Sequence, residues 1–178
     1  MGGTGSGRWG WHSKKTTVEA CLILAAGRLA RDRVITRSSG TGWLSWTNTA
    51  TGERTASAGY SREMHEDQVI LWLRYTTTRR NGKKHDIEER VELQTTPSAV
   101  GGVRWWFTCP LVVNGRSCER RVGKLYLPPG SRYFGCRHCH DLTYTSCQES
   151  HQYDRLFGEL AEATGVDPRL VKAMFARR

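Results

Sequence analysis

Four cysteines in the C-terminal half of the chain have a spacing that suits a metal ion. Cys136 and Cys139 form a Cys-x-x-Cys pair directly after Tyr133-Phe134, and eight residues separate Cys109 from Cys118. Zinc is held tetrahedrally by four thiolate or imidazole ligands, and small modules take two ligands from each of two turns. We therefore expect one structural Zn²⁺ ion at Cys109, Cys118, Cys136 and Cys139.

The spacer between Cys109 and Cys118 is longer than the usual two to four residues of a zinc-binding turn. It contains Asn114-Gly115, a turn dipeptide that can fold the spacer back and bring the two sulfurs together. If the spacer does not close, His140 or Cys147 is the alternative ligand in place of Cys118. The sixth cysteine, Cys21, lies in an apolar run, where a lone cysteine is usually a small buried hydrophobe.

The segment between the two cysteine pairs reads as two strands, RRVGKLYL and SRYF, around a Pro-Pro-Gly turn. Turn, hairpin and turn together are typical of a zinc ribbon, which we place at residues 105–147. A zinc nucleobase deaminase needs His-x-Glu and Pro-Cys-x-x-Cys, and the chain has neither. The four ligands leave no open metal position, so we expect a structural metal and no enzymatic activity.

Three stretches carry a resemblance to a known group of proteins: MGGTGSGRW at the N-terminus, RWWFTCP, and RRVGKLYLPPGSRYFGCRHCHDLTYTS. They resemble a group of bacterial proteins, of phage or mobile-element type, with a Gly-rich N-terminus and a C-terminal zinc ribbon. The resemblance implies the ribbon and a bacterial or mobile-element origin. It implies no catalytic residue.

The charge of the chain favours a polyanionic partner. Lys and Arg number 27 against 17 Asp and Glu, and residues 101–147 alone hold seven basic and two acidic residues. Basic side chains with interleaved aromatics can contact a phosphate backbone and stack on bases. We expect nucleic acid, DNA or RNA, to bind at Arg8, Arg116, Arg120, Arg121, Lys124, Arg132 and Arg137. The alternative is an adaptor or inhibitor that binds a protein of a nucleic-acid-processing complex.

Composition also bears on the compartment. No run approaches the roughly 20 apolar residues of a membrane span, and the N-terminus lacks the apolar core of a signal peptide. We expect a cytoplasmic protein without membrane contact. Cysteines in a reducing compartment are metal ligands or free thiols more often than disulfides.

The elements that must position these residues give an α+β fold. Residues 1–15 are expected to form a flexible basic arm, and residues 16–104 a helix packed on a small antiparallel β-sheet. The capping-box pair Thr16 and Glu19, followed by apolar residues at helical spacing, predicts a helix over residues 17–33.

Period-two patterns predict strands at 42–46, 55–60 and 103–107 and a hairpin around Asn81-Gly82. With these two residues as a two-residue turn, Arg74 faces Glu89 and Trp72 faces Val91. The final segment, 148–178, is expected to be helical, with a last helix from Asp167-Pro168 to about residue 176. Residues 157–176 also match the spacing of a helix-turn-helix, which we keep as an open alternative.

Overall fold

The computed structural model describes residues 15–65, 68–78, 82–99, 101–149, 154–167 and 169–170. Within them the chain is a mostly antiparallel β structure with few helices, consistent with the expected α+β class. The elements in order are the 3₁₀ helix η1 (Val18–Ala20), β1 (Leu22–Ala25), α1 (Ala26–Arg31), β2 (Gly40–Thr47), β3 (Arg54–His65), β4 (Gln68–Thr78), β5 (Lys84–Pro97), β6 (Val103–Thr108), β7 (Val112–Val113), β8 (Arg116–Ser117), β9 (Arg121–Val122), β10 (Lys124–Leu127), α2 (Thr145–Glu149) and α3 (Asp154–Thr164).

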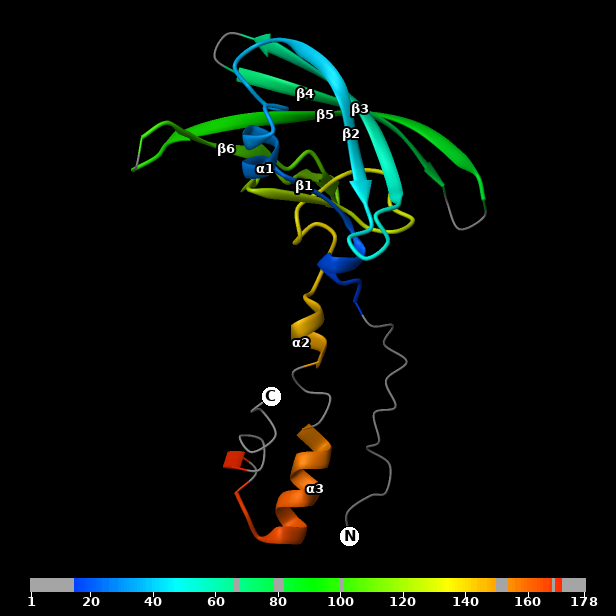
Figure 1. Ribbon diagram of the computed structural model, residues 1–178, viewed down its shortest axis with the longest axis vertical. Coiled ribbons are helices and arrows are strands. Elements are labelled where there is room, and N and C mark those ends of the chain that lie inside the picture. The colour runs from blue at the N-terminus through cyan, green and yellow to red at the C-terminus, as the bar shows by residue number, and fades with distance from the viewer. Residues whose placement is uncertain are drawn as a thin grey trace.

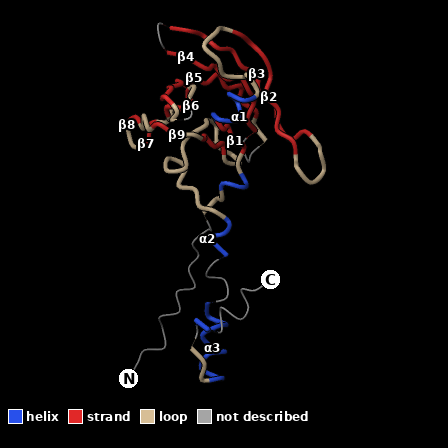
Figure 2. Tube along the Cα trace, turned by 60° about the vertical axis from the view of Figure 1, so that its left-hand side comes forward, coloured by secondary structure: helices blue, strands red, loops and turns tan. Residues whose placement is uncertain are grey.

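One six-stranded sheet forms most of the body, in the order β2-β3-β4-β5-β6-β9, and each neighbouring pair is antiparallel. Its long central strands curve into a half-barrel that arches over α1 (Figures 1 and 2). The three strands predicted at 42–46, 55–60 and 103–107 lie in β2, β3 and β6. The concave face of the sheet holds the core.

The predicted register of the β4–β5 hairpin is wrong by one residue. Arg74 pairs with Glu88, and Val91 pairs with Leu71 instead of Trp72. Thr78 pairs with Lys84, so five residues connect the strands where we predicted a two-residue turn. Because side chains alternate along a strand, a shift by one residue exchanges the two faces.

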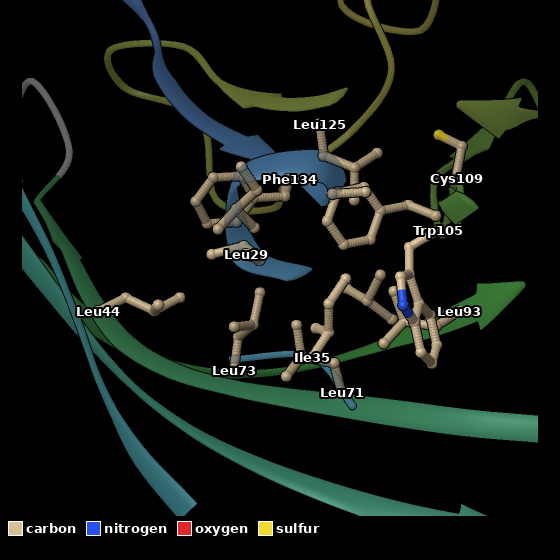
Figure 3. Packing of buried hydrophobic residues seen from close by; sticks show 14 of the residues in the cluster. Leu29, Ile35, Leu44, Leu71, Leu73, Leu93, Trp105, Cys109, Leu125 and Phe134 are labelled. Carbon is tan, nitrogen blue, oxygen red and sulfur yellow. The ribbon is translucent and has the colours of Figure 1, made fainter. Parts of the chain in front are cut away.

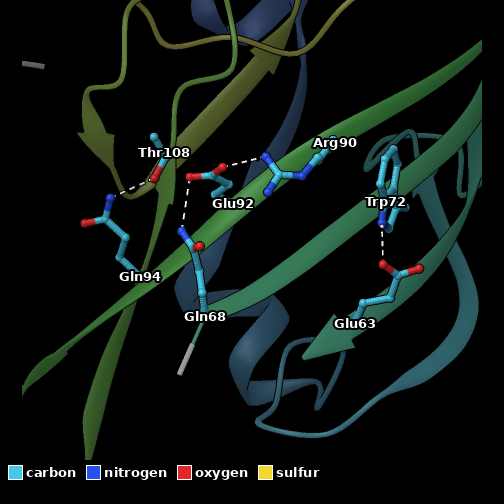
Figure 4. Close-up of polar contacts among 7 residues, drawn as sticks. All are labelled: Glu63, Gln68, Trp72, Arg90, Glu92, Gln94 and Thr108. Carbon is cyan, nitrogen blue, oxygen red and sulfur yellow. Dashed lines mark hydrogen bonds and ion pairs between the residues drawn. The ribbon is translucent and has the colours of Figure 1, made fainter. Parts of the chain in front are cut away.

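With this register the concave face of the β4–β5 pair is apolar except for the buried carboxyl of Glu89, which pairs with Leu73. Leu71 and Leu73 in β4 and Val91 and Leu93 in β5 are each no more than 2% exposed. On the convex face Trp72 donates to Glu63 of β3, and Arg74 forms an ion pair with Glu88. Figure 4 shows further polar contacts of that face, among them Gln68 with Glu92.

The predicted helix over residues 17–33 is only partly correct, because α1 covers six residues of it. Residues 22–25 instead form β1, which pairs antiparallel with β10 from Leu22↔Leu127 to Ala25↔Lys124. The capping box is also wrong. The Glu19 carboxylate accepts hydrogen bonds from the backbone N–H and hydroxyl of Thr145, and backbone pairing to a distant strand outweighs local helical periodicity.

A single buried cluster joins the sheet, α1 and the cysteine-rich segment (Figure 3). Phe107 of β6 and Phe134, two residues before Cys136, are among its largest fully buried side chains. Cys109 and Cys136 belong to the same cluster. The boundary that we placed between residues 104 and 105 falls inside β6, and both sides of it contribute to one core.

After the cysteine-rich segment come α2 and α3, which extend away from the sheet in Figure 1. Most of the predicted last helix, to residue 176, and the 1–14 part of the predicted arm lie outside the described residues, so the helix-turn-helix stays a prediction. Among the described helices none is long and apolar enough to cross a membrane.

Candidate metal centre

The structure brings four cysteine sulfurs together in one place. One ligand atom from each of Cys109, Cys118, Cys136 and Cys139 lies within 4.8 Å of the others. The Sγ atoms of Cys109 and Cys139 are 3.9 Å apart, and so are those of Cys118 and Cys136. The two cysteine-bearing turns predicted from the sequence therefore converge on a site that can hold a metal ion.

The long first spacer closes through a β-hairpin. Val113 pairs with Arg116 across Asn114-Gly115, and both turn residues have positive φ, 52° and 75°. This two-residue loop with both residues left-handed suits Asn-Gly. Below the turn the N–H of Cys118 donates to the carbonyl of Leu111, so the predicted turn brings Cys118 back to Cys109.

Backbone amides point at two of the sulfurs. The Cys136 N–H donates to Cys109 Sγ at 3.2 Å, and the Cys139 N–H donates to Cys136 Sγ at 3.4 Å. Hydrogen bonds of this kind stabilise negative charge on sulfur. The site is thus arranged for thiolates.

Burial disfavours the thiolate form of Cys109 and Cys139. It raises the pKa of Cys109 to about 11, and the pKa of Cys139 is raised further by the same cause. Burial also opposes ionisation at Cys118, but hydrogen bonds from the Arg120 backbone and the neighbouring thiols lower the pKa of Cys118 below its usual value. Four thiolates in such a site need a cation to compensate their charge.

The alternative donors lie outside the cluster formed by the described residues. Cys21 is buried with Val18, Tyr126 and Leu142 and donates to the Thr17 carbonyl. Cys147 is exposed. His140 is not part of the four-residue group, and burial lowers its pKa. Cys118 is therefore favoured over His140 and Cys147 as the fourth ligand.

Comparison with models of known protein families, with curated proteins and with solved structures finds no match for this chain. The site is therefore interpreted from its own geometry.

The basic residues predicted to bind nucleic acid differ in exposure and in their contacts. Arg116, Arg120 and Lys124 are exposed. Arg132 is partly buried near His85, and Arg137 lies over the Tyr144 ring and donates to the Leu142 carbonyl. Arg8 lies outside the described residues.

Arg121 belongs to a group that our sequence analysis did not single out. It lies 5.6 Å from the centroid of the Trp106 ring, and Arg104 lies 4.2 Å from the same ring. Trp106 donates its indole N–H to Thr96, which orients the ring. We call Arg104, Trp106 and Arg121 the arginine–tryptophan cluster. The alternation of Arg104, Trp105 and Trp106 in a strand was the available signal, because it places residues 104 and 106 on the same face.

A buried carboxyl contacts the segment that precedes the second cysteine pair. Glu89 of β5 is 5% exposed. Its Oε2 accepts hydrogen bonds from the Tyr75 hydroxyl at 2.5 Å and the Phe134 N–H at 3.0 Å. Tyr75 also contacts the Arg132 carbonyl at 2.9 Å. Glu89 therefore connects the sheet to the segment that leads into Cys136, which is not a strand although SRYF was predicted to be one.

Desolvation raises the pKa of Glu89 from 4.5 to about 7, although its two hydrogen bonds act in the opposite direction. Since the unfolded chain releases this proton at lower pH, the folded state should lose stability as the pH rises from about 4.5 to 7. Glu89→Gln cannot ionise. We expect its free energy of unfolding, relative to the wild type, to increase by about 2–3 kcal/mol between pH 5 and pH 8.

Urea denaturation of both metal-loaded proteins at the two pH values measures this difference. Effects of pH on the cysteine site are common to both proteins and cancel in the comparison. A difference that does not change with pH would show that Glu89 keeps an ordinary pKa.

Proposed function

We propose that this protein is a non-enzymatic zinc-ribbon protein that binds nucleic acid. Cys109, Cys118, Cys136 and Cys139 would hold one structural Zn²⁺ ion. The arginine–tryptophan cluster and the exposed basic residues of the segment 105–147 would contact the phosphate backbone. A cytoplasmic location, where the thiols stay reduced, agrees with this proposal.

The donor set supports zinc. With Zn–S bonds of about 2.3 Å, sulfurs at the corners of a tetrahedron lie about 3.8 Å apart. The two Sγ–Sγ distances of 3.9 Å agree with that value. Four soft thiolates favour zinc over magnesium or calcium, which prefer oxygen. Because all four positions would be filled by protein, the metal would stabilise the fold and would not activate water.

The arginine–tryptophan cluster is the observation that carries the proposal of nucleic-acid binding. Two guanidinium groups are held at one indole ring, and neither forms an ion pair with an acidic side chain of the described chain. On the same convex face, Arg74 and Arg90 are paired with Glu88 and Glu92. Arginines fixed by an aromatic ring and left without a carboxylate are suited to phosphate.

The proposal is tested by replacing both arginines of the cluster. Arg104→Ala/Arg121→Ala should weaken binding to a single-stranded or duplex DNA or RNA oligonucleotide. If both contact phosphate, the magnitude of the slope of log K against log salt should fall by about 1.4–1.8. Fluorescence anisotropy at several salt concentrations measures both quantities.

Arg74→Ala/Arg90→Ala is the matched control, since it removes the same charge from the same sheet face. We expect little change in its salt dependence, because both arginines are already neutralised. Equal losses in the two double variants would show that net charge alone attracts the oligonucleotide. No binding by the wild type at low salt would refute the proposed function.

A further inference from the structure

The strand β5 has a neighbour on both sides for only part of its length. β4 pairs with β5 from Val69↔Leu93 to Thr78↔Lys84. β6 pairs with it only from Leu93↔Phe107 to Pro97↔Val103. Within the part of the chain that the structure describes, residues 86–92 have no backbone partner on the β6 side. This part of β5 therefore has an unpaired backbone edge, although β5 is an internal strand of the sheet.

The metal site is the reason for the opening. Cys109 continues the pairing with β9, since its N–H donates to the Arg120 carbonyl, but Pro110, the next residue on the β5 side, has no N–H to offer to β5. A side-chain hydrogen bond from Gln94 to Thr108, shown in Figure 4, joins the two strands at this end. Beyond it, the segment 109–119 turns toward the four sulfurs and separates from β5.

The hydrogen-bonding groups that face the opening can be assigned from the ladder. Cys109 bonds to Arg120, the residue opposite it in the β6–β9 register. In an antiparallel ladder every second residue bonds to the same neighbour, so even-numbered residues of β6 face β5. Trp106 faces Gln94 of β5. The same alternation directs the backbone N–H and C=O of Glu88 and Arg90 into the opening.

Two adjoining pockets lie along this edge. One, of about 380 Å³, is lined by three consecutive residues of β5, 88–90, and by Pro110, Leu111, Val112 and Tyr133. Consecutive side chains point to opposite faces, so a pocket that touches all three lies against the backbone edge. The second, of about 260 Å³, shares Arg90 and Pro110 and continues to Glu92, Ser117 and Glu119. We call the two together the β5 groove.

The groove has apolar and acidic walls. Val112 and Tyr133 are 63% and 42% exposed, unusual for side chains of this size. The lining also contains four glutamates and one arginine, although the chain as a whole carries a net charge of +10. Glu119 is exposed and has no ion pair among the described residues. Glu88 and Glu92 are paired with Arg74 and Arg90, and Glu89 is buried, so Glu119 is the carboxylate of this lining that can attract a cationic side chain.

We propose that the β5 groove binds an extended peptide segment of a partner protein by strand addition. The peptide backbone would pair with the N–H and C=O groups of Glu88 and Arg90. Its apolar side chains would contact Val112 and Tyr133, and a Lys or Arg side chain would face Glu119. The distance from Glu88 to Glu92 is about 14 Å at a strand rise of 3.4 Å, enough for four or five peptide residues. This inference does not depend on nucleic-acid binding.

A fluorescein-labelled peptide of eight alternating Val and Lys residues is a suitable probe for the metal-loaded, full-length protein. We expect it to bind with a Kd below about 100 µM, and a peptide of alternating Val and Glu not to bind. Two further probes carry N-methyl groups on all Val amides or on all Lys amides. Strand addition uses the amides of one edge only, so one isomer should bind at least about tenfold more weakly than the other.

The protein variant Glu119→Lys should weaken binding of the Val-Lys peptide about fivefold or more, since it reverses a charge at the groove. Glu53→Lys, an exposed glutamate outside the groove lining, is the matched control and should leave the affinity unchanged. Equal affinities of the two N-methyl isomers, or equal effects of the two protein variants, would overturn strand addition. Displacement of the peptide by a single-stranded oligonucleotide would place both ligands on the basic surface and would overturn it as well.

Discussion

Replacing Cys136 by serine is expected to release the bound metal and to unfold the cysteine-rich segment together with part of the core. Cys136 is 1% exposed, and its sulfur lies 3.9 Å from that of Cys118. Structural zinc contributes about 10–16 kcal/mol in small zinc-binding peptides, which is as large as the whole stability of an ordinary domain. Elemental analysis should give about one zinc per wild-type chain and none in Cys136→Ser.

Thermal unfolding completes this test. Chelator should lower the melting temperature of the wild type to that of Cys136→Ser and should have no further effect on the variant. Cys147→Ser is the matched control, and it should retain its zinc because Cys147 is exposed and outside the cluster. Stoichiometric zinc in a Cys136→Ser/Cys139→Ser protein would contradict the assignment.

The second large effect is expected at Phe134, where the cysteine-rich segment inserts into the concave face of the sheet. Phe134 is 1% exposed. Its ring stacks on Trp46 at 6.1 Å and meets the edge of Tyr75 at 5.5 Å. Phe134→Ala removes a large buried side chain between two aromatic rings, so we expect a loss of about 3–5 kcal/mol in the free energy of unfolding. Urea denaturation of the metal-loaded protein measures it.

The neighbouring residue supplies the control for this experiment. Tyr133 is 42% exposed, and Tyr133→Ala should cost less than about 1 kcal/mol. A similar loss in both variants would mean that the backbone conformation before Cys136, and not the packing of Phe134, determines stability. Phe134→Leu should fall between the two, because leucine fills part of the same volume.

The four-cysteine cluster could be predicted from the sequence because its determinants are local. A Cys-x-x-Cys turn and an Asn-Gly hairpin each form within a few residues, and both have the predicted geometry. The choice of Cys118 over His140 also followed from the turn. The convergence of the two turns on one point required only that the intervening segment fold back.

The errors arose where distant segments decide the structure. Residues 22–25 have a helical pattern but pair with β10, which the local pattern does not reveal. The register of β4 and β5 was inferred from Asn81-Gly82 alone, whereas the concave core requires Leu71 and Val91 to face it together. The arginine–tryptophan cluster was missed for the same reason, since Arg121 reaches Trp106 only through the pairing of β9 with β6.

The pairing of β1 with β10 also has a consequence for the order of events during synthesis. Leu22 bonds across to Leu127, 105 residues later in the chain. A ribosome that adds about 5–20 residues per second needs about 5–20 seconds to make that partner. During this interval β1 has no neighbour, while β2 to β5 can already pair as successive hairpins. The nascent protein should therefore expose an unpaired N-terminal strand, accessible to chaperones or proteases, until β10 has been synthesised.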